Sequence, residues 1–157
     1  MRILIDIRHL CQEKQSGVGE YTKQLLHGIF KIDQENEYIL FSTGRTKPKE
    51  EHGEYSNVLY RHIKTPNQII NTKFIFLKHP SINWYVKETI DLIFLPNLNI
   101  TVLPNDIPCV LTVHDMTWKI FPEFYSKISS IWHIFQNPFY YFPVFPSTKM
   151  YSQRSQY

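Results

Sequence analysis

The chain begins with an apolar run, Ile3-Leu4-Ile5, and a few residues later reads Ser16-Gly17-Val18-Gly19-Glu20-Tyr21. The first run is typical of a short buried strand, and the second is typical of a loop that opens a helix. The first amides of a helix have no partner within it, and the helix dipole adds about half a positive charge there. Because glycine lets a ligand approach the backbone, this strand–loop–helix unit predicts a phosphate-binding site.

Residues 18–32 have the pattern of an amphipathic helix. Five apolar residues recur at intervals of three or four and are expected to share one buried face: Val18, Tyr21, Leu25, Ile29 and Ile32. Ser16 precedes this pattern and is expected to cap the helix. Glu20 falls in the first turn, where its negative charge complements the helix dipole.

Further apolar runs predict the rest of a sheet. Beside Ile3–Ile7, strands are expected at Tyr38–Phe41, Val58–Ile63, Leu92–Leu95 and Cys109–His114. Continuous apolar strands are typical of a parallel sheet that helices cover on both faces. A second helix is expected over Lys73–Lys87, broken or kinked at Pro80. The order predicts an α/β, Rossmann-like domain of three layers with a mostly parallel sheet, whose ligands bind at the carboxyl ends of the strands.

Composition narrows the function classes. The chain has 157 residues and a net charge of +3, which fits one domain, and its basic residues are scattered rather than gathered in the stripe that nucleic-acid binding requires. No secretory signal and no transmembrane run is visible. Cys11 and Cys109 are predicted at opposite ends of the sheet, too far apart for a disulfide, which favours reduced thiols in a cytoplasmic protein.

Several motifs follow one another at compatible spacing. They are Asp6-Ile7-Arg8, Ser16–Tyr21, Tyr38–Phe41, Asp91–Phe94 with Pro96-Asn97, Thr112-Val113-His114-Asp115-Met116 and Phe121-Pro122-Glu123-Phe124-Tyr125. This ordered set resembles the N-terminal domain of a family 4 glycosyltransferase of GT-B fold, over residues 1–138. The resemblance implies two Rossmann-like domains facing each other across a cleft. The first binds the acceptor glycan or lipid-linked sugar, and the second binds the nucleotide-sugar donor. The implied reaction is retaining sugar transfer without a metal or other cofactor, the nucleotide-sugar being a co-substrate.

The glycine-rich loop has a role in that resemblance. Gly17, Val18 and Gly19 match the loop that reaches toward the donor diphosphate. The alternative is that the two glycines merely make a tight turn. Thr22 stands where Gly-x-Gly-x-x-Gly would have its third glycine, which weakens a standard dinucleotide-binding interpretation.

The resemblance also assigns the later strand end. His114 matches the histidine near the transferred sugar and is the candidate catalytic residue, the alternative being a capping or core histidine. Asp115 either binds an acceptor hydroxyl or caps the following turn. Arg8 contacts an anionic group or forms a surface salt bridge, and Tyr21 is a further substrate-binding candidate. The other six histidines, His9 among them, have no partner spacing and are interpreted as structural or exposed.

The end of the chain departs from the family. No Glu-x7-Glu motif occurs, so the resemblance implies half of an active site, inactive without a C-terminal domain or a partner subunit. Residues 139–157 are aromatic and then polar, which predicts an irregular tail from a truncated or altered end, or else a natural docking tail. A peripheral contact at the inner face of the membrane is also expected.

Two rival functions stay open. The first is a non-catalytic sugar- or nucleotide-binding module or remnant, for which the missing donor domain argues. The second is an unrelated Rossmann-like nucleotide-binding protein. That class needs an acidic residue after the second strand to hold a ribose, and Ser42-Thr43-Gly44 supplies none.

Overall fold

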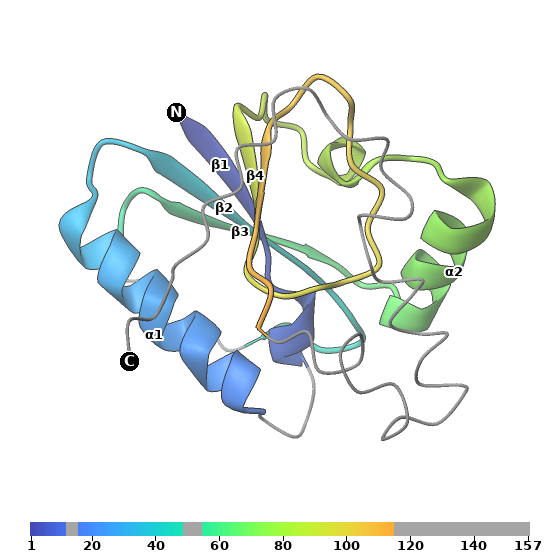
Figure 1. Cartoon of the computed structure of the whole chain (residues 1–157), viewed down its shortest axis with the longest axis horizontal. Helices are drawn as coiled ribbons and strands as arrows, with labels where there is room; N and C mark the ends of the chain where they lie inside the picture. The colour runs from blue at the N-terminus through green and yellow to red at the C-terminus, as the bar shows by residue number, and fades with distance from the viewer. Residues whose placement is uncertain (12–15, 49–54, 115–157) are drawn as a thin grey trace, which may run out of the picture.

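The structure, a computed structural model, describes residues 1–11, 16–48 and 55–114. This part of the chain forms one five-stranded parallel sheet of order β3-β2-β1-β4-β5 (Figure 1). The strands are β1 (Arg2–Asp6), β2 (Glu37–Thr43), β3 (Val58–Ile63), β4 (Leu92–Leu95) and β5 (Cys109–Leu111). The predicted α/β, Rossmann-like fold is confirmed, because parallel strands in this order are those of a mononucleotide-binding half.

The two faces of the sheet bury different helices. Helix α1 (Gly17–Ile32) packs Leu26 and Phe30 against one face, where Ile5 and Leu40 lie fully buried. The 3-10 helix η2 (Ile82–Tyr85) covers the other face through Ile82, and helix α2 (Asn67–Leu77) lies on the same side of the sheet (Figure 1). Neighbouring residues of a strand point to opposite faces, so the apolar runs fill two cores rather than one.

The buried face of α1 differs from the expected one. Tyr21 is 44% exposed and Ile32 is 83% exposed, whereas the buried positions are Gly19, Thr22, Leu26 and Phe30. Thr22 is polar, so a pattern of apolar residues alone does not include it. Its burial is possible because its hydroxyl donates a hydrogen bond to the Val18 carbonyl.

The second helix begins and ends earlier than the sequence predicted. It starts directly after Pro66 and ends at Leu77, and η2 follows as a separate turn, so a helix over Lys73–Lys87 is wrong. Proline suits the start of a helix, because its fixed φ is already helical there. At the other end Lys78 has a left-handed backbone with φ of 50°, and Pro80 follows, so the helix cannot continue.

Strand β5 is shorter than predicted. It ends at Leu111, and the Thr112 amide still donates to the Leu95 carbonyl at 2.9 Å. Beyond that bond the chain leaves the ladder and carries His114 away from the sheet. The chain also leaves the sheet after β1, where it forms the short 3-10 helix η1 (Arg8–Cys11). Both segments therefore reach the carboxyl edge of the sheet.

Candidate functional site

The candidate site lies at the carboxyl edge of the sheet, where the strand order reverses. The chain leaves β1 toward β2 on one side, and β4 pairs with β1 on the other side. Segments that leave such neighbouring strands diverge, and the crevice between them is the usual ligand site of an open α/β sheet. Here η1, the start of α1, and the segments after β4 and β5 meet at the carboxyl edge of the sheet.

The start of α1 is capped as predicted. Ser16 has extended backbone angles, and its hydroxyl oxygen accepts a hydrogen bond from the Gly19 amide at 3.2 Å. Its carbonyl accepts from the Glu20 amide at 3.1 Å. The Gly19 amide is therefore already partnered, and Ser16 competes for it with any ligand at this helix end.

The two loop glycines are helical residues. Neither has a left-handed backbone, since the only described glycine with positive φ is Gly44. A tight turn that needs glycine is therefore wrong for Gly17 and Gly19. An added Cβ at Gly17 would meet no atom within 4 Å, and one at Gly19 would lie 3.6 Å from Leu10 Cδ2. The backbone does not require glycine at either position, so the open space over Gly17 is the feature that calls for a function.

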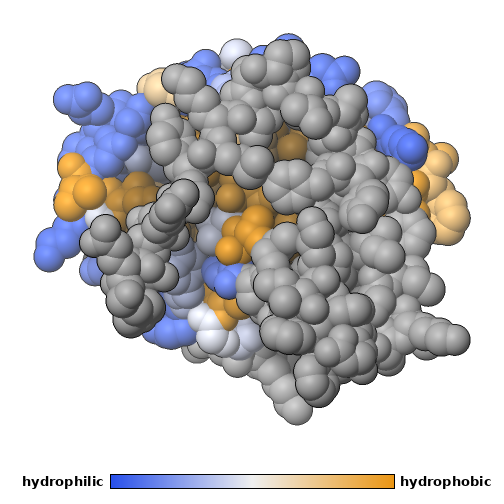
Figure 2. Space-filling view, in the orientation of Figure 1, coloured by the Kyte–Doolittle hydropathy of each residue, from blue (hydrophilic) through white to orange (hydrophobic). Residues whose placement is uncertain are grey.

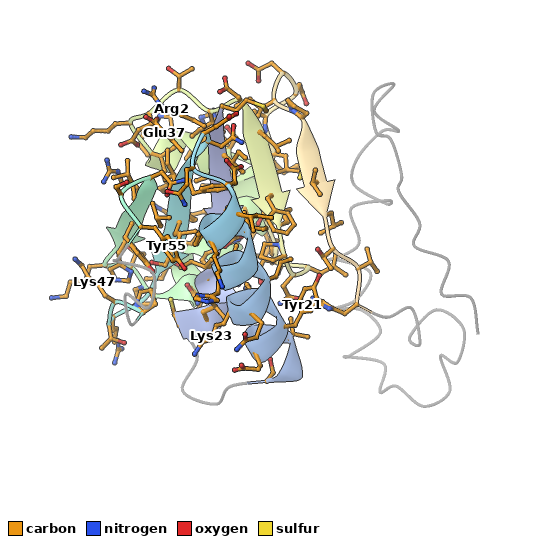
Figure 3. All side chains as sticks on the ribbon, turned by 90° about the vertical axis from the view of Figure 1, so that its left-hand side faces the viewer. Arg2, Tyr21, Lys23, Glu37, Lys47 and Tyr55 are labelled. Carbon is orange, nitrogen blue, oxygen red and sulfur yellow. The ribbon has the colours of Figure 1, made fainter. Side chains whose placement is uncertain are left out.

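His114 lies beside Tyr21 of α1. The two rings meet edge-on with centroids 5.1 Å apart, and Figure 3 shows Tyr21 on the side of α1 that faces the segment after β5. His114 Nε2 lies 2.9 Å from the Pro96 carbonyl oxygen, which follows β4. A carbonyl oxygen only accepts, so Nε2 carries the proton and Nδ1 of the neutral ring is a hydrogen-bond acceptor.

His9 is a site residue that the sequence interpretation missed. Its Nε2 lies 2.9 Å from Thr22 Oγ1, whose own proton goes to the Val18 carbonyl. Thr22 therefore accepts, and His9 carries its proton on Nε2. Nδ1 is buried, and it has no hydrogen-bond partner among the residues that the structure describes. The available signal was its position: His9 follows Arg8, within three residues of the carboxyl end of β1.

Burial keeps the His9 ring neutral. The pKa of His9 is lowered from 6.5 to about 4, chiefly by desolvation; Asp6 opposes this shift, and the nearby His114 and Arg8 add to it. A protonated ring would place an N–H at buried Nδ1 with no acceptor. His9 is thus an uncharged hydrogen-bonding group at neutral pH.

His9 makes the folded protein sensitive to acid. The unfolded state takes up its proton near pH 6.5 and the folded state near pH 4. Stability contributed by neutral His9 is therefore present above pH 6.5 and falls as the pH drops toward 4, by about 3 kcal/mol over the whole interval. We expect His9→Gln to flatten this part of the pH dependence in urea unfolding. Equal slopes for the two proteins between pH 4 and 6.5 would contradict the assignment.

Arg8 is engaged in a buried ion pair. Arg8 is 3% exposed and Asp6 is fully buried, so the alternative of a surface salt bridge is wrong. The guanidinium donates to both Asp6 carboxylate oxygens at 2.6–3.1 Å. Burial alone would raise the pKa of Asp6, but the Arg8 charge and hydrogen bonds outweigh it and lower that pKa.

The same guanidinium joins three segments. Nη1 donates to Asn71 Oδ1 of α2 at 3.1 Å, and Nη2 donates to the Ile100 carbonyl and to Thr101 Oγ1 at 3.0 and 2.5 Å. The ring of Phe74 lies 5.3 Å from the guanidinium carbon. Arg8 thus ties the end of β1 to α2 and to the segment after β4, and each of its three side-chain nitrogens has a protein partner.

Other predicted features are placed as follows. Asp115, the motif at Phe121–Tyr125 and the tail at 139–157 lie outside the described residues. Within the described ranges no group of three or more His, Cys, Asp or Glu side chains is placed to hold a metal ion. Cys11 and Cys109 are free thiols, and burial raises the pKa of Cys109 to about 12, which keeps it from acting as a thiolate nucleophile at neutral pH.

Comparisons with known proteins give no relative. No model of a protein family matches the sequence, and neither the curated proteins nor the solved structures include a significant match. None of the helices in the described ranges is both long and apolar enough to cross a membrane.

Proposed function

We propose that this domain is the N-terminal, acceptor-side half of a retaining glycosyltransferase that takes its sugar from a nucleotide-sugar. The donor diphosphate lies against the start of α1, and the transferred sugar lies beside His114. The acceptor is a glycan or a lipid-linked sugar, and the enzyme works in the cytoplasm at the inner face of the membrane. No metal takes part, because the helix end supplies positive charge for the phosphates.

The juxtaposition of His114, Tyr21 and the start of α1 is the observation that carries this proposal. These groups come from distant parts of the sequence and meet at the crevice where α/β sheets bind ligands. A ligand at the helix end would lie beside the His114 imidazole, whose Nδ1 can accept a hydrogen bond. A sugar hydroxyl is the donor that such an acceptor suits.

The glycine at the helix start supports the phosphate role. Gly17 is the first residue of α1, and it has ordinary helical geometry and open space where a side chain would point. A phosphate oxygen approaching the amides would use that space, and a side chain would block it.

Gly17→Val provides the test. We expect it to weaken binding of UDP- and GDP-sugars to the chain by at least tenfold, because the branched side chain occupies the phosphate's space. Gly28→Val is the matched control, since Gly28 is a second α1 glycine with open space around its Cβ position. Isothermal titration calorimetry on both folded variants measures the difference. Equal affinities would refute the placement of the diphosphate.

A further inference from the structure

The basic residues are spread along the chain, but the net positive charge comes from one segment. Residues 1–63 carry nine basic and nine acidic side chains, and residues 88–157 carry four basic and five acidic ones. Residues 64–87 carry four lysines and no acidic residue. These lysines are all exposed: Lys64, Lys73, Lys78 and Lys87. The net charge of +3 therefore originates in the segment that forms α2 and η2.

The same segment exposes large apolar side chains. Phe76 is 78% exposed, Leu77 is 66% exposed and Ile69 is 49% exposed. Ile69, Lys73 and Phe76 are spaced by four and three residues, so they lie along one outward face of α2. The inward face is separate and buries Ile70 and Phe74. Figure 2 shows apolar surface at the right-hand edge, where Figure 1 places α2.

A tryptophan extends this surface into η2. Trp84 is 69% exposed, and its ring meets that of Tyr85 edge-on with centroids 5.5 Å apart. Tyr85 in turn contacts the buried Phe74 of α2, with ring centroids 6.0 Å apart. The two elements are thus packed together, and the indole remains at their surface.

We propose that this lysine–aromatic surface, formed by α2 and η2, binds an anionic lipid bilayer. Lysines beside exposed Phe, Leu and Trp side chains are the composition of helices that lie in a membrane interface. The indole suits the headgroup level, because one edge is apolar and its N–H is a donor. The lysines attract anionic headgroups, and residues 64–87 carry no acidic side chain. This inference rests on the membrane location in the proposed function and names the surface for it, but its test with vesicles does not require sugar transfer.

Sedimentation with lipid vesicles tests the proposal on the whole chain. We expect binding to vesicles of phosphatidylcholine with phosphatidylglycerol, weak binding to phosphatidylcholine alone, and a loss of binding as salt rises. Lys73→Gln should lower the partition coefficient about fivefold, the contribution of one lysine near an anionic surface. Phe76→Ser should lower it about tenfold or more through lost apolar burial.

Helix α1 supplies matched controls on the other face of the sheet. Lys31→Gln removes an exposed helical lysine, and Ile32→Ser removes an apolar side chain that is 83% exposed. Both should leave the partition coefficient unchanged. The difference in emission between the chain and Trp84→Phe isolates Trp84, which should shift to the blue on anionic vesicles. Equal losses in the α1 and α2 variants, or a chain that binds double-stranded DNA and no vesicles, would overturn the proposal.

Discussion

Arg8→Met should lower the free energy of unfolding by about 3–5 kcal/mol, the usual cost of leaving one partner of a buried ion pair alone. Asp6 is fully buried, and Arg8 supplies its counter-charge together with hydrogen bonds to both carboxylate oxygens. The substitution also removes the bonds from Arg8 to Asn71 and to the Ile100 carbonyl. Urea unfolding followed by circular dichroism measures the loss.

Arg2→Met is the control for this prediction. Arg2 pairs with Glu37 at the opposite edge of the sheet, where both side chains are about half exposed (Figure 3). An exposed pair contributes little, so the stability should hardly change. The double change Asp6→Leu with Arg8→Met should recover much of the loss, because it buries no unpaired charge. If Arg8→Met and Arg2→Met lowered the free energy of unfolding by similar amounts, the buried pair would not stabilise the fold more than the exposed one.

In an active enzyme that contains this domain, His114→Ala should lower kcat/KM by about tenfold to a thousandfold. This loss corresponds to about 1.4–4 kcal/mol of transition-state stabilisation. The Nδ1 acceptor is the group that the proposed mechanism uses. His79→Ala is the control, since His79 is an exposed histidine in the chain reversal after α2. Steady-state kinetics of nucleotide release measures both variants.

His114→Gln separates catalysis from structure. A glutamine amide can donate to the Pro96 carbonyl as Nε2 does, but it does not reproduce the Nδ1 acceptor. If Nδ1 acts on the sugar, the His114→Gln enzyme should be as slow as the His114→Ala enzyme. Its thermal stability should nevertheless return to that of the unchanged protein. Full activity in the Gln variant would make His114 a positioning residue for the segment after β4.

The sequence contained the local signals for most of the sheet. Val58–Ile63 and Leu92–Leu95 were predicted with the bounds that the structure shows, because each is a short run rich in β-branched, aromatic and other apolar residues. The cap at Ser16 was equally local. Which strands pair, and that His114 would lie against Tyr21, depend on contacts between distant residues and are visible only in the folded chain.

Two errors have a common physical cause. The burial of Thr22 and of Arg8 rests on hydrogen-bond partners that compensate for desolvation: the Val18 carbonyl for one, and Asp6 with Asn71 for the other. A residue-by-residue scale of polarity scores both side chains as exposed. His9 was interpreted as lying outside the site for the same reason. Its hydrogen bond to Thr22 depends on how η1 lies against α1, which no local pattern in the sequence indicates.

An amide-resolved NMR titration of this chain with UDP- and GDP-sugars tests the central claim most directly. The account predicts chemical-shift changes that saturate with ligand and that cluster at residues 16–20, at Tyr21 and on the His114 ring. Methyl and amide signals at the amino edge, around Arg2 and Glu37, should stay in place. Saturable binding that leaves residues 16–21 and His114 unperturbed would contradict the account, whichever nucleotide is bound.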